Sequence, residues 1–173
     1  EKEKQEEPTK NDTGLFHFHG DPGAPFAVIC AGGGFTYVGS LHEGFPHALE
    51  ISRRGYNAFV LKYRVGSGRR ATEDLAAAIS HIYENADALS VDAHRYSLWG
   101  SSAGARMAAY IGSYGVHGFG GDRISGPGTV VMAYTGHADY SPNDPPTFAI
   151  VGENDRIAVP STMERRINAM KAN

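Results

Sequence analysis

The stretch YSLWGSSAG, residues 96–104, decides the fold prediction for this chain. It joins a strand predicted at 95–99 to a helix predicted at 103–114, and the turn between them matches the pattern G-x-S-x-G. In this strand–turn–helix setting the pattern predicts that the hydroxyl of Ser102 is exposed above the sheet as a nucleophile. The alternative is that Ser101 or Ser102 only caps the helix.

Outward from this turn, short apolar runs alternate with amphipathic segments. Further strands are predicted at 26–31, 57–63, 128–133 and 147–151. Further helices are predicted at 45–54, from an N-cap at Thr72 to Tyr83, and from Pro160 onward. The alternation predicts crossover connections and a mostly parallel sheet with helices on both faces. Ligands of such sheets bind in the loops that follow the strands.

Size and composition limit the kinds of protein this chain can be. Its 173 residues fit one domain, which we place at 13–173, after a polar arm at 1–12 that we expect to be disordered. A net charge of -3 gives no basic footprint for nucleic acid, and no apolar run reaches the ~18 residues of a membrane span. We expect a cytoplasmic location, with secretion left open if a signal peptide was removed. The oligomeric state also stays open.

Three glycines follow the first predicted strand, at Gly32, Gly33 and Gly34. Without side chains in the way, their backbone N–H groups can donate hydrogen bonds to an oxyanion. A plain turn is the first alternative. A phosphate loop is the second, but it requires a following lysine or a G-x-G-x-x-G pattern, and the sequence has neither.

An acidic residue follows the last predicted strand, where Asp155 lies in the loop GENDRIAVP at 152–160. An acid in this position, after the serine in the chain, fits a role in orienting a catalytic imidazole. The alternative is an aspartate that only shapes the turn or the start of the next helix. Glu153 is the second candidate for the acid, and Asp139 and Asp144 are less favoured.

Together these motifs resemble the α/β-hydrolase superfamily, and most closely its esterase and lipase branch with an H-G-G-G oxyanion loop. That branch includes acetyl esterases and acetyl-xylan esterase-like proteins. The resemblance rests on AGGGF at 31–35, LKYR at 61–64, GSSAG at 100–104 and GENDRIAVP at 152–160. It implies a three-layer α/β fold and a serine esterase that takes short acyl esters, such as those of sugars, and needs no metal or cofactor.

The same resemblance implies roles for individual residues. Ser102 would be the nucleophile and Asp155 the acid of a catalytic triad. The backbone N–H groups of Ala103, Gly33 and Gly34 would form the oxyanion hole. Gly32, Gly100 and Gly104 would be the motif glycines that allow the close turns.

The sequence departs from this family at two places. Ala31 stands where the loop pattern has its histidine, and no histidine follows Asp155, where the family places the catalytic one. We therefore expect a chain that lacks the last strand and helix of the fold. A substitute base from His42 or His137 is one alternative. The other is a catalytically incomplete fragment or a binding domain that uses the same pocket without turnover.

Other chemically active residues receive simpler interpretations. His17 and His19 alternate as in an edge strand, and no third metal ligand accompanies them. Cys30, the only cysteine, lies at a strand end and is expected to be a small buried side chain rather than a nucleophile. Arg64, Arg69 and Arg70 follow a strand, where they could contact an acidic substrate, although a solvated position is the favoured interpretation.

Overall fold

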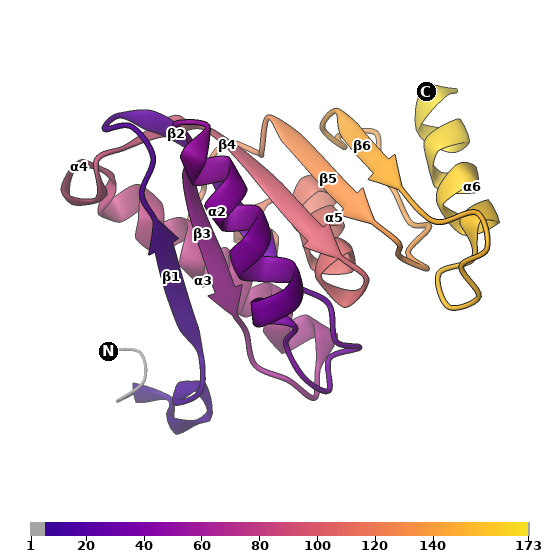
Figure 1. Ribbon diagram of the computed structural model, residues 1–173, viewed down its shortest axis with the longest axis horizontal. Coiled ribbons are helices and arrows are strands. Elements are labelled where there is room, and N and C mark those ends of the chain that lie inside the picture. The colour runs from indigo at the N-terminus through magenta and orange to yellow at the C-terminus, as the bar shows by residue number, and fades with distance from the viewer. Residues whose placement is uncertain (1–5, 173) are drawn as a thin grey trace.

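The computed structural model describes residues 6–172 and contains one six-stranded sheet (Figure 1). Its strands lie side by side in the order β1-β3-β2-β4-β5-β6. Their bounds are β1 Gly14–Phe18, β2 Ala24–Cys30, β3 Asn57–Lys62, β4 Val91–Ser101, β5 Thr129–Ala133 and β6 Thr147–Ile150. The edge strand β1 is antiparallel to β3, and every other pairing is parallel. This confirms the mostly parallel sheet that the sequence predicts.

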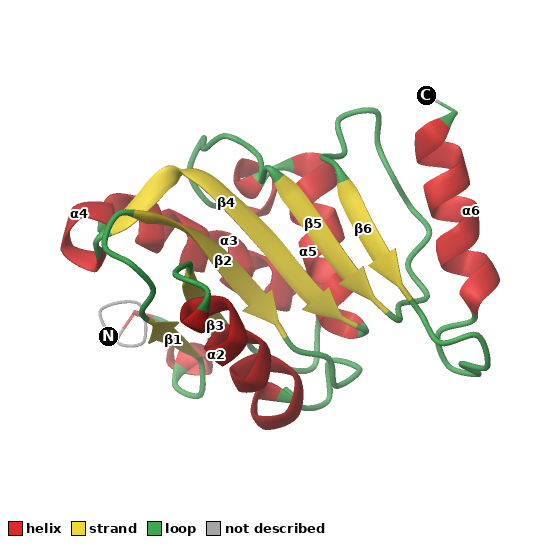
Figure 2. Cartoon of the chain, turned by 45° about the horizontal axis from the view of Figure 1, so that its top comes forward, coloured by secondary structure: helices red, strands yellow, loops and turns green. Residues whose placement is uncertain are grey.

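Helices cover both faces of the sheet (Figure 2). Helix α2, Phe45–Arg53, packs on one face, and α3, Gly68–Glu84, and α5, Ala103–Tyr114, pack on the other. Helix α6, Pro160–Lys171, follows β6. The short elements are α4 Ala86–Leu89, a π-helical turn at Ser40–Gly44, and 3₁₀ turns at Pro8–Lys10 and Val116–Phe119. Within residues 6–172, no helix has the length and apolar character needed to cross a membrane.

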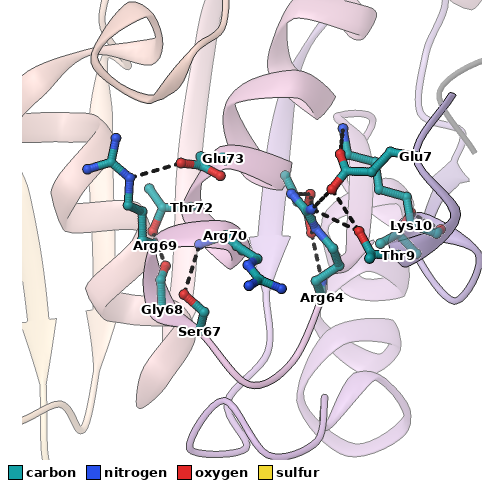
Figure 3. Close-up of polar contacts among 12 residues, drawn as sticks. Glu7, Thr9, Lys10, Arg64, Ser67, Gly68, Arg69, Arg70, Thr72 and Glu73 are labelled. Atoms are coloured by element: carbon teal, nitrogen blue, oxygen red, sulfur yellow. Dashed lines mark hydrogen bonds and ion pairs between the residues drawn. The ribbon is translucent and has the colours of Figure 1, made fainter.

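The start of α3 corrects one prediction. The N-cap is Ser67 rather than Thr72, and its hydroxyl oxygen accepts a hydrogen bond from the Arg70 amide at 3.3 Å (Figure 3). Thr72 is buried inside the helix and donates from Oγ1 to the Gly68 carbonyl. The first turn holds glycine and arginines, which lack apolar periodicity, so the sequence pattern begins one turn late.

The main core lies between the sheet and helices α3 and α5. Val28, Leu98 and Met132 from three strands are fully buried, as are Ile79 and Met107 from the two helices. Alanines and glycines on α5 keep the helix backbone close to the sheet. This close approach fixes the position of the turn that precedes α5.

The N-terminal segment packs on the domain through Arg64. This arginine was expected to be solvated, but its side chain is only 8% exposed and pairs with the buried carboxylate of Asp74 at 2.8 Å. A second bond from its guanidinium goes to Glu7, beside the 3₁₀ turn at Pro8–Lys10 (Figure 3). Glu7 and Thr9 of the predicted polar arm therefore contact the domain through Arg64. Residues 1–5 of that arm lie outside the described part.

Strand β6 forms the second edge of the sheet. The register aligns Phe148 with Val131, and Val131 with Trp99, so these side chains share the face on which α2 packs. Phe148 is 59% exposed and Ile150 is 55% exposed. This end of the face is open among residues 6–172 (Figure 2).

Candidate active site

Ser102 occupies the turn between β4 and α5 in a strained backbone conformation. Its φ is 51° and its ψ is -114°, a region that residues with a side chain seldom adopt. The Ser102 amide donates to the Ala133 carbonyl of β5 at 2.8 Å, and its side chain makes no capping hydrogen bond. The alternative that Ser102 only caps the helix is therefore wrong. The hydroxyl stands at the positive end of α5 without a capping role.

Both glycines of the turn are needed for its geometry. A Cβ on Gly100 would lie 2.3 Å from the Gly104 carbonyl oxygen, so a side chain there would collide with the next turn of chain. A Cβ on Gly104 would lie 1.9 Å from the Cys30 carbonyl oxygen of β2. These contacts explain why the sequence carries glycine two residues before and two residues after Ser102.

The glycine loop lies directly beside this turn. A Cβ on Gly32 would be 3.0 Å from the Cβ of Ser102. Gly33 has a φ of 138°, and a Cβ there would lie 2.1 Å from the Tyr37 carbonyl oxygen, so only glycine fits. The Gly34 φ of 61° also lies in the region that favours glycine.

The amides of this loop differ in their partners. The Gly32 amide donates to the Glu43 carboxylate at 2.5 Å. The amides of Gly33 and Gly34 meet no acceptor among the described residues. The Ala103 amide is one of the first in α5, where helix geometry provides no acceptor. The two loop amides and the Ala103 amide thus remain available to an oxyanion.

Glu43 and Tyr134 belong to this site, although the motif analysis did not single them out as site residues. Tyr134 follows β5 with a φ of 36°, and its hydroxyl interacts with the side chains of Ser101 and Glu43. Burial raises the pKa of Tyr134; the Ser101 hydrogen bond opposes this shift and the Glu43 carboxylate adds to it. The contact of Glu43 with Gly32 spans 11 residues and depends on the π-helical turn at 40–44, which leaves no periodic signal.

Asp155 lies at the same edge of the sheet, in the loop after β6. One of its carboxylate oxygens accepts the amides of Ile157 and Ala158, each at 2.8 Å, so it shapes the loop as the alternative interpretation expects. No described residue donates to its other oxygen. In the sheet β5 lies between β4 and β6, so Ser102 and Asp155 follow strands that are not adjacent.

The other candidate acids have different surroundings. Glu153 and Asp139 are exposed. The Asp144 side chain is 2% exposed and forms an ion pair with Arg166 from α6. Asp144 therefore has a structural partner away from the turn at Ser102.

None of the eight histidines hydrogen-bonds Ser102 or Asp155 within the described residues. His42 is exposed in the turn beside Glu43, and His137 is buried against the Tyr110 ring at 4.8 Å. His17 bonds Asn57 at 3.0 Å and stacks on Phe59. No group of three metal-ligating side chains occurs in the part of the chain that the structure describes. The structure therefore does not provide the serine with a histidine base.

The Cys30 thiol is fully buried at the end of β2. Burial raises the pKa of this thiol to about 12, so it stays protonated at neutral pH. This agrees with its expected role as a small buried side chain.

His137 should make the protein acid-sensitive. Burial, reinforced by the Arg166 guanidinium and opposed by Asp139, lowers the pKa of His137 from 6.5 to about 4. The unfolded chain takes up this proton near pH 6.5 and the folded chain only near pH 4, so acid favours unfolding. Urea titrations at pH 7.5 and 4.5 should show a loss of about 2 kcal/mol from this group. That part of the loss should disappear in His137→Gln; an unchanged pH dependence in the variant would contradict the assignment.

Comparison with known proteins places this sequence in a family. The sequence profile of the BD-FAE family matches residues 18–123. Endo-1,4-beta-xylanase B of Butyrivibrio fibrisolvens is 34% identical over 96 residues, which cover 52% of this chain and 14% of that protein. The chain thus spans about a seventh of the length of this curated relative.

Solved structures show the same fold. An α/β hydrolase from a Medee basin deep-sea metagenome library, MGS-M1, superposes with a TM-score of 0.80 and 24% identity, covering 94% of this chain and 72% of that one. An acetyl ester-xyloside bifunctional hydrolase from Caldicellulosiruptor lactoaceticus gives a TM-score of 0.81 and 22% identity, with 92% and 73% covered. Because the family profile covers more than half of the sequence, the chain belongs to the BD-FAE family, and its fold is that of the α/β hydrolases.

Proposed function

We propose that the turn at Ser102 is the acyl-transfer site of a serine ester hydrolase. The observation that carries the proposal is the strained backbone of Ser102, which leaves its hydroxyl without a capping role at the start of α5. Strain of this kind is maintained at functional sites because the surrounding contacts over-determine it. Here those contacts are the close approaches of Gly100 and Gly104.

In the proposed reaction, the Ser102 oxygen attacks the ester carbonyl carbon and its proton passes to a general base. The negative charge that forms on the carbonyl oxygen accepts hydrogen bonds from the amides of Ala103, Gly33 and Gly34. Each such donor contributes about 3 kcal/mol to the transition state. The base then protonates the departing alcohol, and water attacks the acyl-serine by the reverse sequence of proton transfers. This chemistry requires no metal or cofactor.

Asp155 is the proposed acid that orients the base. One oxygen of Asp155 has no donor among the described residues, and Asp155 follows β6 at the edge of the sheet where Ser102 follows β4, which suits an acid that holds an imidazole. No histidine among residues 6–172 forms a hydrogen bond with Ser102 or Asp155. This observation favours a second candidate function, a domain that binds an ester in the same pocket without turnover.

The proposed substrates are small esters with short acyl groups, including acetyl esters of sugars. Support comes from the similarity to a protein named a xylanase and to a structure described as an acetyl ester-xyloside hydrolase.

The first test supplies the missing base from solution. Hydrolysis of p-nitrophenyl acetate is measured with and without added imidazole, and the rate due to imidazole alone is subtracted. We expect imidazole to raise the protein-dependent rate about tenfold, and we expect Ser102→Ala to lose this increase, because the increase requires an acyl-serine. Ser161→Ala, an exposed serine on α6, is the matched control and should behave as the unchanged chain.

The outcomes separate the two candidate functions. A first-turnover burst without imidazole would show that a residue of this chain acts as the base. If folded Ser102→Ala hydrolyses p-nitrophenyl acetate as fast as the unchanged chain, both with and without imidazole, the ester hydrolase proposal is contradicted. The binding domain would then be the remaining candidate function.

A further inference from the structure

A cavity of about 330 Å³ lies between the N-terminal parts of α3 and α5. Its lining includes three aromatic rings, Phe35, Tyr110 and Phe119, and two arginines, Arg69 and Arg106. Both arginines are exposed to solvent. Flat apolar walls beside cationic groups suit a ring that carries a negative charge. We call this space the arginine cavity.

Two residues that line the arginine cavity, Phe35 and Arg106, follow closely in the chain on the glycine loop and on Ser102. Phe35 directly follows the glycine loop, and its φ of 59° is held by a hydrogen bond of 2.6 Å from the Gly66 amide to its carbonyl. A Cβ on Gly68 would lie 3.1 Å from the Phe35 ring, so this glycine lets the ring close against α3. On the other wall, the Arg106 amide donates to the Ser102 carbonyl at 3.3 Å, which places Arg106 one helical turn, about 6 Å, beyond Ser102.

The two arginines differ in how they are paired. The Arg106 guanidinium contacts the hydroxyl and ring of Tyr110, at 3.1 Å and 5.5 Å, and no described carboxylate pairs with it. Arg69 pairs with Glu73 at 3.0 Å, where the side chains are 78% and 34% exposed (Figure 3). An exposed pair of this kind is weak and exchanges with other ligands. Arg106 is therefore the arginine of this cavity whose charge no described carboxylate neutralises.

From this arrangement we infer that the arginine cavity binds the alcohol part of an anionic ester, a six-membered ring that carries a carboxylate. A planar guanidinium pairs with a carboxylate through two parallel hydrogen bonds, while the three aromatic rings contact the substrate ring. A uronate and an aryl carboxylate share this chemistry. The inference rests on the proposed ester hydrolase function, because it assigns the ring to the alcohol that Ser102 would release.

Equilibrium binding tests the cavity without requiring turnover. Calorimetric titration compares 4-hydroxybenzoate with 4-hydroxybenzamide, and methyl glucuronoside with methyl glucoside. We expect the carboxylate of at least one pair to bind about tenfold more tightly than its neutral partner, as for a hydrogen bond to a charged group. The pair that shows this preference tells whether the ring is an aryl carboxylate or a uronate. Ser102→Ala should keep this preference.

Variants of Arg106 identify the anchor. In Arg106→Met the ratio of carboxylate to neutral-ligand affinity should fall to about one. In Arg106→Lys part of this ratio should remain, because lysine keeps the positive charge but lacks the two parallel N–H donors of the guanidinium. Arg165→Gln, an exposed arginine on α6, is the matched control and should keep the full ratio. Equal affinities within both pairs, or a preference that survives Arg106→Met, would overturn the inference.

The same titrations separate this inference from the proposed function. A carboxylate preference in a protein whose Ser102 proves unreactive would retain the cavity as a binding site and remove its role in ester hydrolysis. A reactive Ser102 without any carboxylate preference would retain the ester hydrolase and remove the arginine cavity from the account.

Discussion

Asparagine in place of Asp144 is expected to lower the free energy of unfolding by about 3–5 kcal/mol. Both side chains of the Asp144–Arg166 pair are 2% exposed. Arg166 Nε and Nη1 have no partner in the described residues, so the buried guanidinium depends on Asp144. Removing the carboxylate charge leaves an uncompensated cation in the interior.

Removing the other partner of the pair, in Arg166→Met, should lower the free energy of unfolding by less. Asp144 also accepts hydrogen bonds from the Ser113 hydroxyl and from the amide and hydroxyl of Ser141. In Arg166→Met the carboxylate keeps these donors, so we expect a smaller loss than in Asp144→Asn. The double variant should lose less than the sum of the single losses, because the two groups interact directly. Urea unfolding of the three variants measures this; a loss below about 1 kcal/mol for Asp144→Asn would contradict the account.

Alanine in place of Gly104 is expected to destabilise the protein by at least about 4 kcal/mol, enough to leave much of it unfolded. The added Cβ would lie 1.9 Å from the Cys30 carbonyl oxygen, which is backbone in a central strand and has little room to move. To relieve the clash, α5 must shift away from β2. That shift opens the core and moves the turn that holds Ser102.

Thermal unfolding and the yield of folded protein measure this effect. Gly126→Ala is the matched control, because a Cβ there meets nothing within 4 Å and the backbone has no positive φ. It should fold like the unchanged chain. A Gly104→Ala variant with the same melting temperature as Gly126→Ala would show that the close contact of α5 with β2 is not needed.

The sequence was sufficient where structure depends on neighbours along the chain. The helix at 103–114 follows from a local pattern of small residues and is present with those bounds, and the sharp turn before it lies at Ser102, since β4 continues to Ser101. The parallel sheet followed from the alternation of strands and helices. The strand predicted at 95–99 was too short. β4 begins at Val91, and the polar residues Asp92 and His94 interrupt the apolar pattern in its first residues.

The remaining features depend on contacts between distant segments. Arg64 looked like a solvated residue, but its burial depends on Asp74 and on Glu7, which is 57 residues away. Glu43 has no motif of its own, and only the return of its turn to Gly32 brings it to the site. The arginine cavity likewise combines residues from four separate segments, so local sequence could name Arg69 as a candidate but could not place Arg106 beside Phe35.

The most direct test of the account is to locate the reactive serine by mass spectrometry. The folded chain is treated with a fluorophosphonate in imidazole buffer, digested, and mapped for phosphonylated peptides. We predict a single adduct on Ser102, present in Ser161→Ala and absent in Ser102→Ala. An adduct on a different serine, or no adduct on a protein that circular dichroism shows to be folded, would contradict Ser102 as the nucleophile.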